Sequence, residues 1–338
     1  VNNDPNTPSW LKEVPSKAVK QALIYAERAF KDYFSKRKGK PKFKKKGTND
    51  SFYLIGTLKV ERHRIFVPVL KWIRLKEFGY IPEKISSVTI SMKNGRYYIS
   101  CLCKEDKDER IALSNKSMGI DFGLKDQFIT EEQTIPSINR SLRIRKLEQR
   151  LRKEQRRLSR KIEANMIEKV YYQKGAKKGQ LKSFQWVKPL SECRNIQKQK
   201  KKVAQIHERL TRIRTDYNRK ALLSLVLERK PSSITIENLS VRNLVKNRHL
   251  SAAIMKAQWF QSRLYLENLC NRLGIELRVV DRFYPSSKLC STCGFKYKDL
   301  KLNQRFWTCS NCGSEHDRDR NAAINLGRCE TYTVLTAV

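Results

Sequence analysis

The chain has 338 residues, and its 72 lysines and arginines outnumber its 33 aspartates and glutamates, which gives a formal net charge of +39. A length of this size allows about two or three domains. A field of this strength attracts polyanions, so we expect nucleic acid as the main partner. The sequence contains no run of about 18 apolar residues, which a membrane-spanning helix would need. It also does not open with the apolar core of a signal peptide. The sequence therefore predicts a protein of the cytoplasm or nucleoid.

The N-terminal part is predicted to hold one amphipathic helix followed by a basic loop. Apolar side chains recur at helical spacing at Val19, Leu23, Ala26, Phe30 and Phe34. Residues 35–47, SKRKGKPKFKKKG, then place glycine, proline and phenylalanine among the lysines. A charge run is usually a solvated tail, but this composition also suits a loop lying on a phosphate backbone. The candidate nucleic-acid-binding residues are Lys36, Arg37, Lys38, Lys40, Lys42, Lys44, Lys45 and Lys46.

From Phe52 to Cys103 the apolar pattern changes to the period of two that is typical of strands. About five short strands are expected. Asn94-Gly95 is a strong signal for a hairpin turn between the last two of them. Antiparallel strands of this kind favour a small barrel or curled sheet, and the polar residues 104–115 are predicted to form a linker.

A third region begins at residues 117–130, SMGIDFGLKDQFIT, where two apolar runs flank a turn and Asp121 lies inside the first strand. Two long helices with apolar stripes follow, and the second keeps a heptad spacing over several turns. They are predicted to pack antiparallel as an arm with basic outer faces, either a structural spacer or a rail for a nucleic-acid backbone. Between them, residues 170–190 form a basic, aromatic tip that either stacks on bases or only closes the arm.

The order of the remaining elements predicts an α/β module. Residues 232–240, SSITIENLS, suggest a short buried strand that ends at Glu237. A helix stopped by Gly274 follows, and residues 275–283, IELRVVDRF, suggest another strand. Strands that alternate with helices in this way favour a sheet covered by helices.

Four cysteines near the C-terminus have the spacing of a zinc ribbon. Cys290 and Cys293 form one C-x2-C pair, Cys309 and Cys312 form another, and a glycine follows each pair. Glycine suits the tight turns that such pairs require. Because all four ligands are thiolates, no position is left for water, and we predict one structural Zn²⁺ ion. His316 lies four residues beyond Cys312, and we do not assign it as a ligand.

Carboxylates at strand and helix ends are the candidates for chemistry. Asp121 lies in an apolar strand, Glu237 at the end of another, and Asp317 and Asp319 at the start of a helix behind the ribbon. A buried ionised carboxylate is costly unless it is paired or bound to a metal. Three carboxylates around one point make a Mg²⁺ site, and two such ions can hydrolyse a phosphodiester. Each signal is weak alone, but their order together with the ribbon is much more specific.

Four motifs, in this order, resemble the TnpB (OrfB) nucleases of insertion sequences: GIDFGLKD, ITIENLSV, YPSSKLCSTCG and CGSEHDRDRNAAINL. The segment WLKEVPSKAVKQALIYAERAFKDYF also resembles that family, so the similarity spans nearly the whole chain. The family consists of RNA-guided relatives of the type V CRISPR effectors. Its members usually begin with a strand and a helix that this chain, which starts at Val1, lacks, so we expect an N-terminally truncated member.

The resemblance implies a fold class of α/β plus all-β. An RNase H-like (RuvC) nuclease domain is expected over residues 113–338, with a helical arm at about 140–230 and a zinc-ribbon insert at about 284–316. A helical recognition segment with the basic loop is expected over 1–48, and a small β-barrel (wedge-like) domain over 49–112.

The resemblance also implies that Asp121, Glu237 and Asp319 are the catalytic residues and hold two Mg²⁺ ions. Asp319 is preferred because it stands two residues before Asn321, with Asp317 as the runner-up. The implied function is a transposon-associated, RNA-guided DNA endonuclease of the prokaryotic cytoplasm, monomeric on each guide RNA. Its partners would be guide RNA, double-stranded target DNA and the displaced single strand. The alternatives are an inactive or truncated RNA-guided DNA-binding repressor and an accessory transposase protein.

Overall fold

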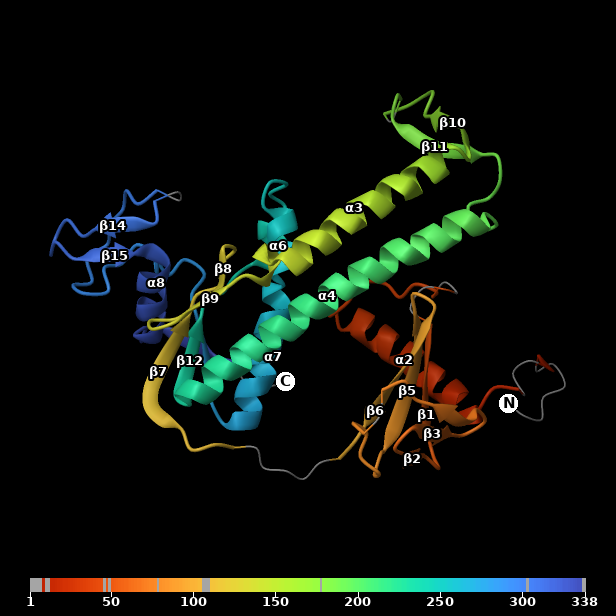
Figure 1. Cartoon of the computed structure of the whole chain (residues 1–338), viewed down its shortest axis with the longest axis horizontal. Helices are drawn as coiled ribbons and strands as arrows, with labels where there is room; N and C mark the ends of the chain where they lie inside the picture. The colour runs from red at the N-terminus through yellow and green to blue at the C-terminus, as the bar shows by residue number, and fades with distance from the viewer. Residues whose placement is uncertain are drawn as a thin grey trace. The chain divides into compact units, whose positions relative to one another are not determined.

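The structure, a computed structural model, describes residues 8–9, 13–44, 47, 50–77, 79–104, 110–176, 178–301 and 304–335. The chain divides into two compact units, Val1–Lys107 and Asp108–Val338 (Figure 1). Each unit has an apolar core of its own. Across the described ranges, no helix combines the length and the apolar character that a membrane crossing requires.

The first unit combines one long helix with short antiparallel strands. Its elements are α2 (Ser16–Phe34), β1 (Ser51–Ile55), β2 (Lys59–Glu61), β3 (Arg64–Val67), β4 (Lys71–Arg74), β5 (Ser87–Lys93) and β6 (Arg96–Leu102). The strands form two three-stranded sheets, β1-β5-β6 and β2-β3-β4. Leu54, Ile65 and Val88, drawn from both sheets, are buried in one core. The described strands form two hydrogen-bonded sheets around this core, because β2, β3 and β4 pair only with one another. The small barrel or curled sheet stays a prediction.

Two local predictions for this unit are confirmed. Asn94 and Gly95 have φ values of 53° and 71° and join β5 to β6, as a tight hairpin turn requires. Helix α2 covers the predicted amphipathic segment. None of its residues is fully buried, and Phe30 and Phe34 stay exposed on its surface.

The second unit is built on a four-stranded sheet in the order β16-β13-β12-β7. Its strands are β7 (Ser114–Ile120), β12 (Pro231–Ile236), β13 (Glu276–Val280) and β16 (Tyr332–Val334). Strand β12 runs parallel to both β7 and β13, whereas β16 pairs antiparallel with β13. A hairpin of β8 (Asp126–Ile129) and β9 (Thr134–Pro136) adjoins β7, because Asp121 pairs with Ile129 just beyond the end of β7. This mixed α/β unit agrees with the predicted α/β module.

Helices cover both faces of this sheet. The helices are α3 (Leu142–Glu163), α4 (Arg194–Arg229), α5 (Val241–Leu244), α6 (Ser251–Ala257), α7 (Trp259–Leu273) and α8 (Arg318–Gly327), and a short 3-10 turn, η1, spans Ile138–Arg140. In β13, Val279 packs into the core that holds Leu225 of α4 and Leu269 of α7. The next residue, Val280, packs against Leu326 of α8. Because neighbouring strand residues point to opposite faces, α4 and α7 lie on one face and α8 on the other.

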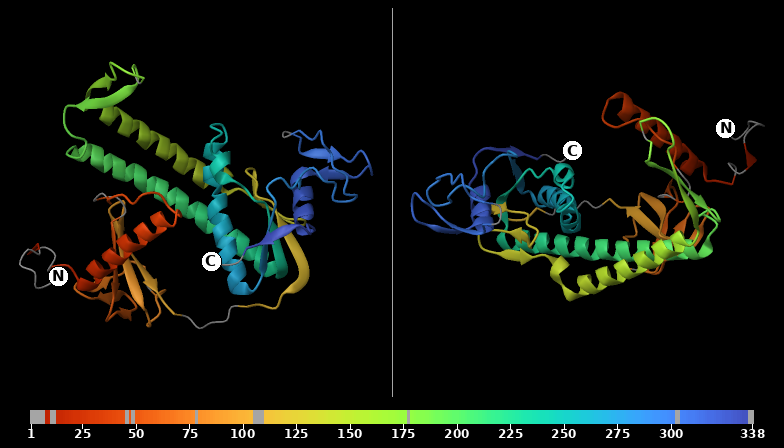
Figure 2. Two further views of the ribbon diagram at one scale, coloured as in Figure 1. Left: turned by 180° about the vertical axis from the view of Figure 1, so that it is seen from behind. Right: turned by 90° about the horizontal axis from the view of Figure 1, so that it is seen from above.

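Helices α3 and α4 form the antiparallel arm that the sequence predicts. Arg214 of α4 donates to Glu148 of α3 at 2.6 Å, and Gln199, which lies earlier in α4, donates to Glu154, which lies later in α3, also at 2.6 Å. Leu151 and Leu210 belong to the apolar seam between the helices. The remaining strands lie in two hairpins, β10 (Met166–Tyr171) with β11 (Leu181–Trp186) at the arm tip, and β14 (Phe306–Thr308) with β15 (Glu315–Asp317) in the cysteine-rich segment (Figure 2).

Candidate functional site

Two of the predicted carboxylates leave the sheet side by side. Strands β7 and β12 are parallel, and their register pairs Ile120 with Ile236. Asp121 and Glu237 are the next residues of each strand. Adjacent strands lie about 4.8 Å apart, so the two carboxylates start from neighbouring backbone positions. Backbone hydrogen bonds in both directions between Asp121 and Ile129 fix the first of them.

The two aspartates at the start of α8 have different surroundings. Asp317 is the N-cap of α8, and its Oδ1 accepts hydrogen bonds from the backbone N–H groups of Asp319 and Arg320, both at 3.0 Å. Asp319 lies in the first turn, and its carboxylate forms ion pairs with Arg305 at 2.7 Å and with Arg318 at 2.8 Å. The carboxylate of Asp317 is therefore engaged in capping the helix, whereas that of Asp319 lies among side chains.

The structure brings Asp121, Glu237 and Asp319 close enough to influence one another. Burial raises the pKa of Asp121 well above its ordinary value, and the negative charges of Glu237 and Asp319 raise it further. Burial also raises the pKa of Glu237, although a hydrogen bond from Ser286, at 2.5 Å from Oε1, opposes this. Glu237 and Asp319 therefore lie close enough to Asp121 to disfavour its ionisation, and a bound cation would stabilise such a cluster.

The contact between β7 and α8 explains how Asp319 approaches the other carboxylates. Gly119 lies two residues before Asp121, and a Cβ added there would overlap the backbone oxygen of Ala323. Ala322 and Ala323 are completely or almost completely buried at this contact. The small residues on both sides let the helix backbone lie directly on the strand. The sequence analysis did not identify this contact, although the glycine before the aspartate and the two alanines were its visible signs.

The four predicted zinc ligands converge on one point. Their sulfur atoms lie within 4.8 Å of one another. The Sγ atoms of Cys290 and Cys312 are 3.6 Å apart, as are those of Cys293 and Cys309. Zinc–sulfur bonds of about 2.3 Å in a tetrahedron place sulfurs about 3.8 Å apart, so these separations fit such a site.

The surroundings of Cys290 favour a thiolate. Burial raises the pKa of its thiol, but hydrogen bonds from Ser314, two backbone amides and His316 outweigh this and lower the pKa to about 5. His316 Nε2 lies 3.0 Å from Cys290 Sγ and 2.8 Å from Ser314 Oγ. Among the described residues, the cluster that could hold a metal ion consists of the four cysteines, and His316 contacts one of them.

Two buried asparagines connect the cysteine-rich segment to α8. Asn321 Nδ2 and Asn325 Nδ2 each donate to the Leu289 carbonyl oxygen at 2.7 Å, and Asn321 Oδ1 accepts from the backbone N–H of Ser291 at 2.9 Å. Both asparagines are buried. The first cysteine turn is therefore held on the helix that carries Asp319. The sequence analysis used Asn321 only to align the motif and missed this structural role.

The predicted basic loop is only partly described. Lys36, Arg37, Lys38, Lys40, Lys42 and Lys44 are exposed, whereas Lys45 and Lys46 lie outside the described residues. Arg37 and Lys38 approach Asp32 at 3.9 Å and 2.7 Å. The loop therefore presents accessible positive charge on the first unit, and a nucleic-acid-binding role stays a prediction.

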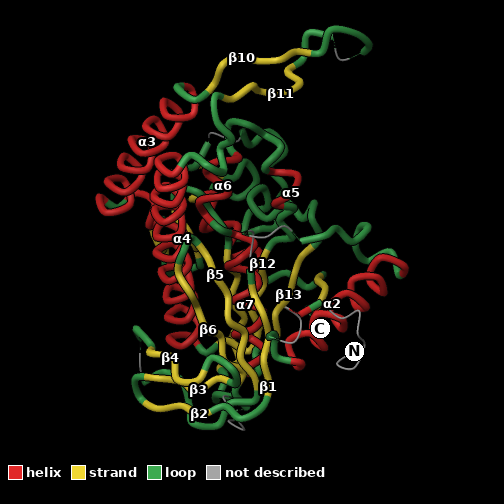
Figure 3. The backbone as a smooth tube through the Cα atoms, turned by 90° about the vertical axis from the view of Figure 1, so that its right-hand side faces the viewer, coloured by secondary structure: helices red, strands yellow, loops and turns green. Residues whose placement is uncertain are grey.

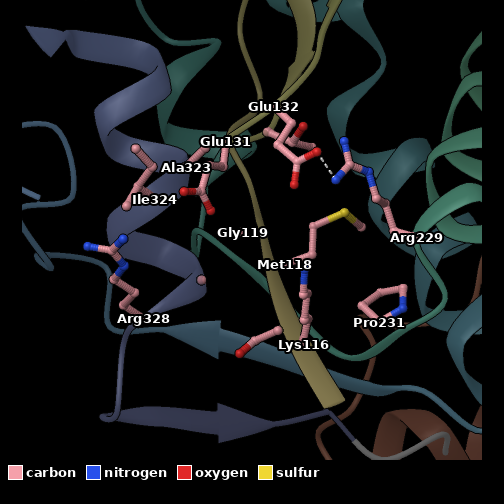
Figure 4. A pocket seen from close by; sticks show the side chains of 13 residues that line it. Lys116, Met118, Gly119, Glu131, Glu132, Arg229, Pro231, Ala323, Ile324 and Arg328 are labelled. Carbon is pink, nitrogen blue, oxygen red and sulfur yellow. Dashed lines mark ion pairs between the residues drawn. The ribbon is translucent and has the colours of Figure 1, made fainter. Parts of the chain in front are cut away.

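A cavity of about 410 Å³ lies beside the same strand but away from the carboxylates. Figure 4 shows Gly119 and Met118 of β7 facing it, with Arg328 on one side and an ion pair between Arg229 and Glu132 on the other. Asp121, Glu237 and Asp319 are not among its lining residues. The carboxylate cluster, which lies just beyond the ends of β7 and β12, is therefore not part of this cavity.

Comparison with known proteins gives related sequences along nearly the whole chain. Residues 259–326 match the family description "Cas12f1-like, TNB domain". A protein of Streptomyces pristinaespiralis named "Putative RNA-guided DNA endonuclease" is 34% identical over 327 residues, covering 94% of this chain and 72% of its own length. The Escherichia coli K12 protein named "Putative RNA-guided DNA endonuclease InsQ" is 28% identical over 334 residues, covering 94% of this chain and 75% of its own length.

A cryo-EM structure of a Cas12f1–sgRNA–target DNA complex overlaps with 88% of this chain and 74% of its own, at 14% identity and a TM-score of 0.41. Identity of 34% across 94% of the chain, with the motif order described above, is sufficient to assign the family. The chain belongs to the TnpB-like family of RNA-guided DNA endonucleases.

Proposed function

We propose that this protein is a transposon-associated, RNA-guided DNA endonuclease that cuts DNA phosphodiester bonds at Asp121, Glu237 and Asp319. The convergence of these carboxylates from β7, β12 and α8 is the observation that carries the proposal. The raised pKa values of Asp121 and Glu237 are typical of sites that hold a cation or transfer protons. The names of the relatives, which describe RNA-guided DNA endonucleases, support the same activity for this chain.

The donor set fits Mg²⁺. Hard oxygen ligands from carboxylates are the protein ligands that this ion prefers, and it takes its remaining ligands from water and phosphate. Bound in a pair, Mg²⁺ ions would activate a water molecule and stabilise the leaving oxygen of the phosphodiester. The residues of the chain orient the ligands: the backbone of Ile129 fixes Asp121, the Ser286 hydroxyl holds Glu237, and Arg305 with Arg318 holds Asp319.

The capping role of Asp317 supports Asp319 as the third ligand. A carboxylate that accepts two backbone N–H bonds is held at the helix end, and turning toward a metal would leave those N–H groups unpaired. In its described hydrogen bonds, the Asp319 carboxylate accepts from the side chains of Arg305 and Arg318 and from no backbone N–H group. Its negative charge also raises the pKa of Asp121. We therefore assign Asp121, Glu237 and Asp319 to Mg²⁺.

We assign one structural zinc ion to Cys290, Cys293, Cys309 and Cys312. The sulfur separations suit tetrahedral thiolate coordination, and four thiolates leave no position open for substrate or water. Because Asn321 and Asn325 donate hydrogen bonds to the Leu289 carbonyl, the ribbon would hold α8, and with it Asp319, in position.

The charge of +39 suits a protein that encloses a nucleic-acid backbone. If base pairing of a guide RNA selects the target, the protein needs to recognise mainly backbone shape and charge. In this account, residues 113–338 form a RuvC-like nuclease domain, and the helical segment 1–48 and the wedge-like region 49–112 contact guide RNA and target DNA. One protein molecule would act on each guide RNA, first opening the target duplex and then cutting its displaced and paired strands.

The proposal is tested by purifying the protein with the RNA that co-purifies with it, sequencing that RNA, and incubating the complex with a library of DNA duplexes matched to the guide. We expect cutting of matched DNA with Mg²⁺, no cutting of mismatched DNA, and none by the variant Asp121→Asn. Guided binding with no cutting by either protein would instead identify a DNA-binding repressor. Cutting by both proteins at equal rates would overturn the assignment of the site.

A further inference from the structure

The tip of the arm carries a two-stranded β hairpin that extends beyond the ends of α3 and α4 (Figure 3). Strands β10 and β11 pair antiparallel, and side chains of both are exposed or only partly buried. None of the described apolar clusters includes a residue of this hairpin. The base of the hairpin is nevertheless fixed, because Asn165 Nδ2 donates to the Lys188 carbonyl at 2.7 Å and the Val187 amide donates to the Asn165 carbonyl at 3.0 Å.

One face of the hairpin combines two aromatic rings with a lysine. Phe184 and Trp186 alternate along β11 and therefore share a face. Their rings lie 5.3 Å apart at an angle of 30°. Lys169 of β10 is the direct cross-strand partner of Phe184 and therefore lies on the same face. We call Lys169, Phe184 and Trp186 the aromatic face.

The opposite face has a different composition. Ser183 and Gln185 alternate with the aromatic residues of β11, and the cross-strand partners of Ser183 and Gln185 are Val170 and Glu168. Residues 166–188 contain six lysines and one glutamate, so the hairpin as a whole is strongly basic. Lys169 and the paired rings meet on the aromatic face, and Phe184 there is 39% exposed.

An isolated two-stranded hairpin is marginally stable in water, and exposed aromatic rings add a cost unless a partner covers them. Exposed aromatic rings beside lysines are the usual platform for unpaired nucleotides, because bases stack on the rings while the ammonium groups approach the phosphates. We propose that the aromatic face binds unpaired nucleotides of the guide RNA by stacking. This inference rests on the proposed function, in which a guide RNA is the constant partner of the protein.

Charge and shape favour RNA over other occupants. A membrane or an acidic protein would match the lysines but would not require two adjacent rings on one strand face. Unpaired RNA loops present splayed bases that stack on aromatic side chains, and this is the main mode of sequence-specific RNA recognition. The sequence of the target DNA, in contrast, is recognised by base pairing with the guide RNA, so the protein has to contact only the DNA backbone.

The test compares two double variants. Phe184→Ala with Trp186→Ala removes the rings from the aromatic face, and Ser183→Ala with Gln185→Ala alters the other face of the same strand. The probe is the RNA that co-purifies with the wild-type protein, sequenced and transcribed, and its affinity is measured by filter binding without divalent ions. Stacking contributes about 1–3 kcal/mol per base, so losing both rings should weaken RNA binding at least about tenfold. The control variant should stay within about twofold of the wild type.

Two further measurements sharpen this comparison. Chemical probing of the bound RNA should show a few unpaired nucleotides that the wild type protects and that become reactive with the ring-deleted variant. Replacing Lys169 by glutamine should reduce the salt dependence of RNA binding by about one phosphate contact, whereas deleting the rings should leave the slope unchanged. Thermal unfolding midpoints of all variants should match the wild type, because the hairpin lies outside the described cores.

Equal RNA affinity of the ring-deleted variant and the wild type would overturn the proposal. Equal losses in both double variants would also overturn it, since they would indicate general distortion of the hairpin. A single-stranded DNA of the same sequence serves as the second probe, and loss of binding to that DNA alone would reassign the face to the displaced strand. Because RNA binding is measured without cleavage, failure of this inference leaves the nuclease proposal standing, and absence of nuclease activity leaves the RNA result interpretable.

Discussion

Gly119 of β7 and Ala323 of α8 are in such close contact that a side chain on the glycine would overlap the alanine's backbone oxygen. The glycine lies two residues before Asp121, and Ala323 lies four residues after Asp319. This contact therefore sets how far apart those two carboxylates can be. It couples the packing of the second unit to the geometry of its proposed metal site.

Replacing Gly119 by alanine should reduce both stability and cleavage. The added methyl group has to push α8 away from β7, and overpacking of this kind costs about 1–3 kcal/mol. Urea unfolding measures the loss, and the displaced Asp319 should lower the cleavage rate as well. Gly39→Ala is the control, because a Cβ at Gly39 meets no atom within 4 Å. Unchanged stability and activity of Gly119→Ala would contradict the tight contact.

Substitutions of Asp317 and Asp319 should have different effects, because Asp317 caps the helix and Asp319 is the proposed metal ligand. Asp319→Asn should lower the cleavage rate by at least about a thousandfold, as expected for losing a metal ligand worth several kcal/mol. Asp317→Ser keeps a capping oxygen and should retain cleavage, whereas Asp317→Ala should lower the free energy of unfolding by about 1 kcal/mol. The assignment is wrong if Asp317→Ser abolishes cleavage while Asp319→Asn retains it.

The carboxylate cluster should make the metal-free protein less stable as pH rises. The pKa of Asp121 in the folded protein lies well above its ordinary value of 3.8, so the folded state binds this proton more tightly than the unfolded state does. The stabilising contribution of the protonated group is full below pH 3.8 and is lost as pH rises through the raised pKa. In a chelating buffer, Asp121→Asn should therefore gain stability relative to the wild type with increasing pH.

Chemical denaturation across a series of pH values measures this difference. Asp216→Asn is the control, because Asp216 is an exposed residue of α4 with a side chain that is 64% accessible. Adding Mg²⁺ should reverse the effect for the wild type and leave Asp121→Asn unchanged. A stability difference that is independent of pH, or that grows as pH falls, is incompatible with the raised pKa.

Removing zinc should disable cleavage before it unfolds the second unit. The purified protein should contain about one zinc per chain, and Cys309→Ser should lose most of it, because a tetrahedral site with three remaining thiolates binds more weakly. Asn321 and Asn325 would then lose the ordered carbonyl of Leu289 that they contact. Cleavage should fall sharply while most helical circular dichroism remains.

Metal analysis alongside the cleavage assay checks this expectation. Cys103→Ser is the matched control, since Cys103 lies in the first unit and outside the cluster of four sulfurs. That variant should retain both zinc and cleavage. A wild-type protein that folds and cleaves without bound zinc would show that the ribbon has a different role.

Local signals in the sequence were sufficient for much of the site. The spacing of the four cysteines predicted a cluster that the structure contains, because two ligands separated by two residues on a tight turn can point to the same side. The strands before Asp121 and Glu237 were visible as apolar runs, and parallel pairing brings such ends to one edge. The antiparallel arm followed from its heptad spacing.

Contacts between segments that are distant in the chain could not be predicted from the sequence in the same way. Arg305 pairs with Asp319 only because the ribbon folds back onto α8, and nothing near Arg305 in the sequence indicates that partner. The choice between Asp317 and Asp319 depended on which carboxylate caps the helix. The aromatic tip of the arm was recognised by composition, but the placement of Lys169 on the same face as Phe184 and Trp186 required the strand register.

The most direct test of the central claim is diffraction from crystals soaked in Mn²⁺, measured at an energy where manganese scatters anomalously. The account predicts anomalous density within coordinating distance of the carboxylates of Asp121, Glu237 and Asp319, and its disappearance in Asp121→Asn. Crystals with those side chains well ordered and no manganese among them at millimolar concentration would contradict it.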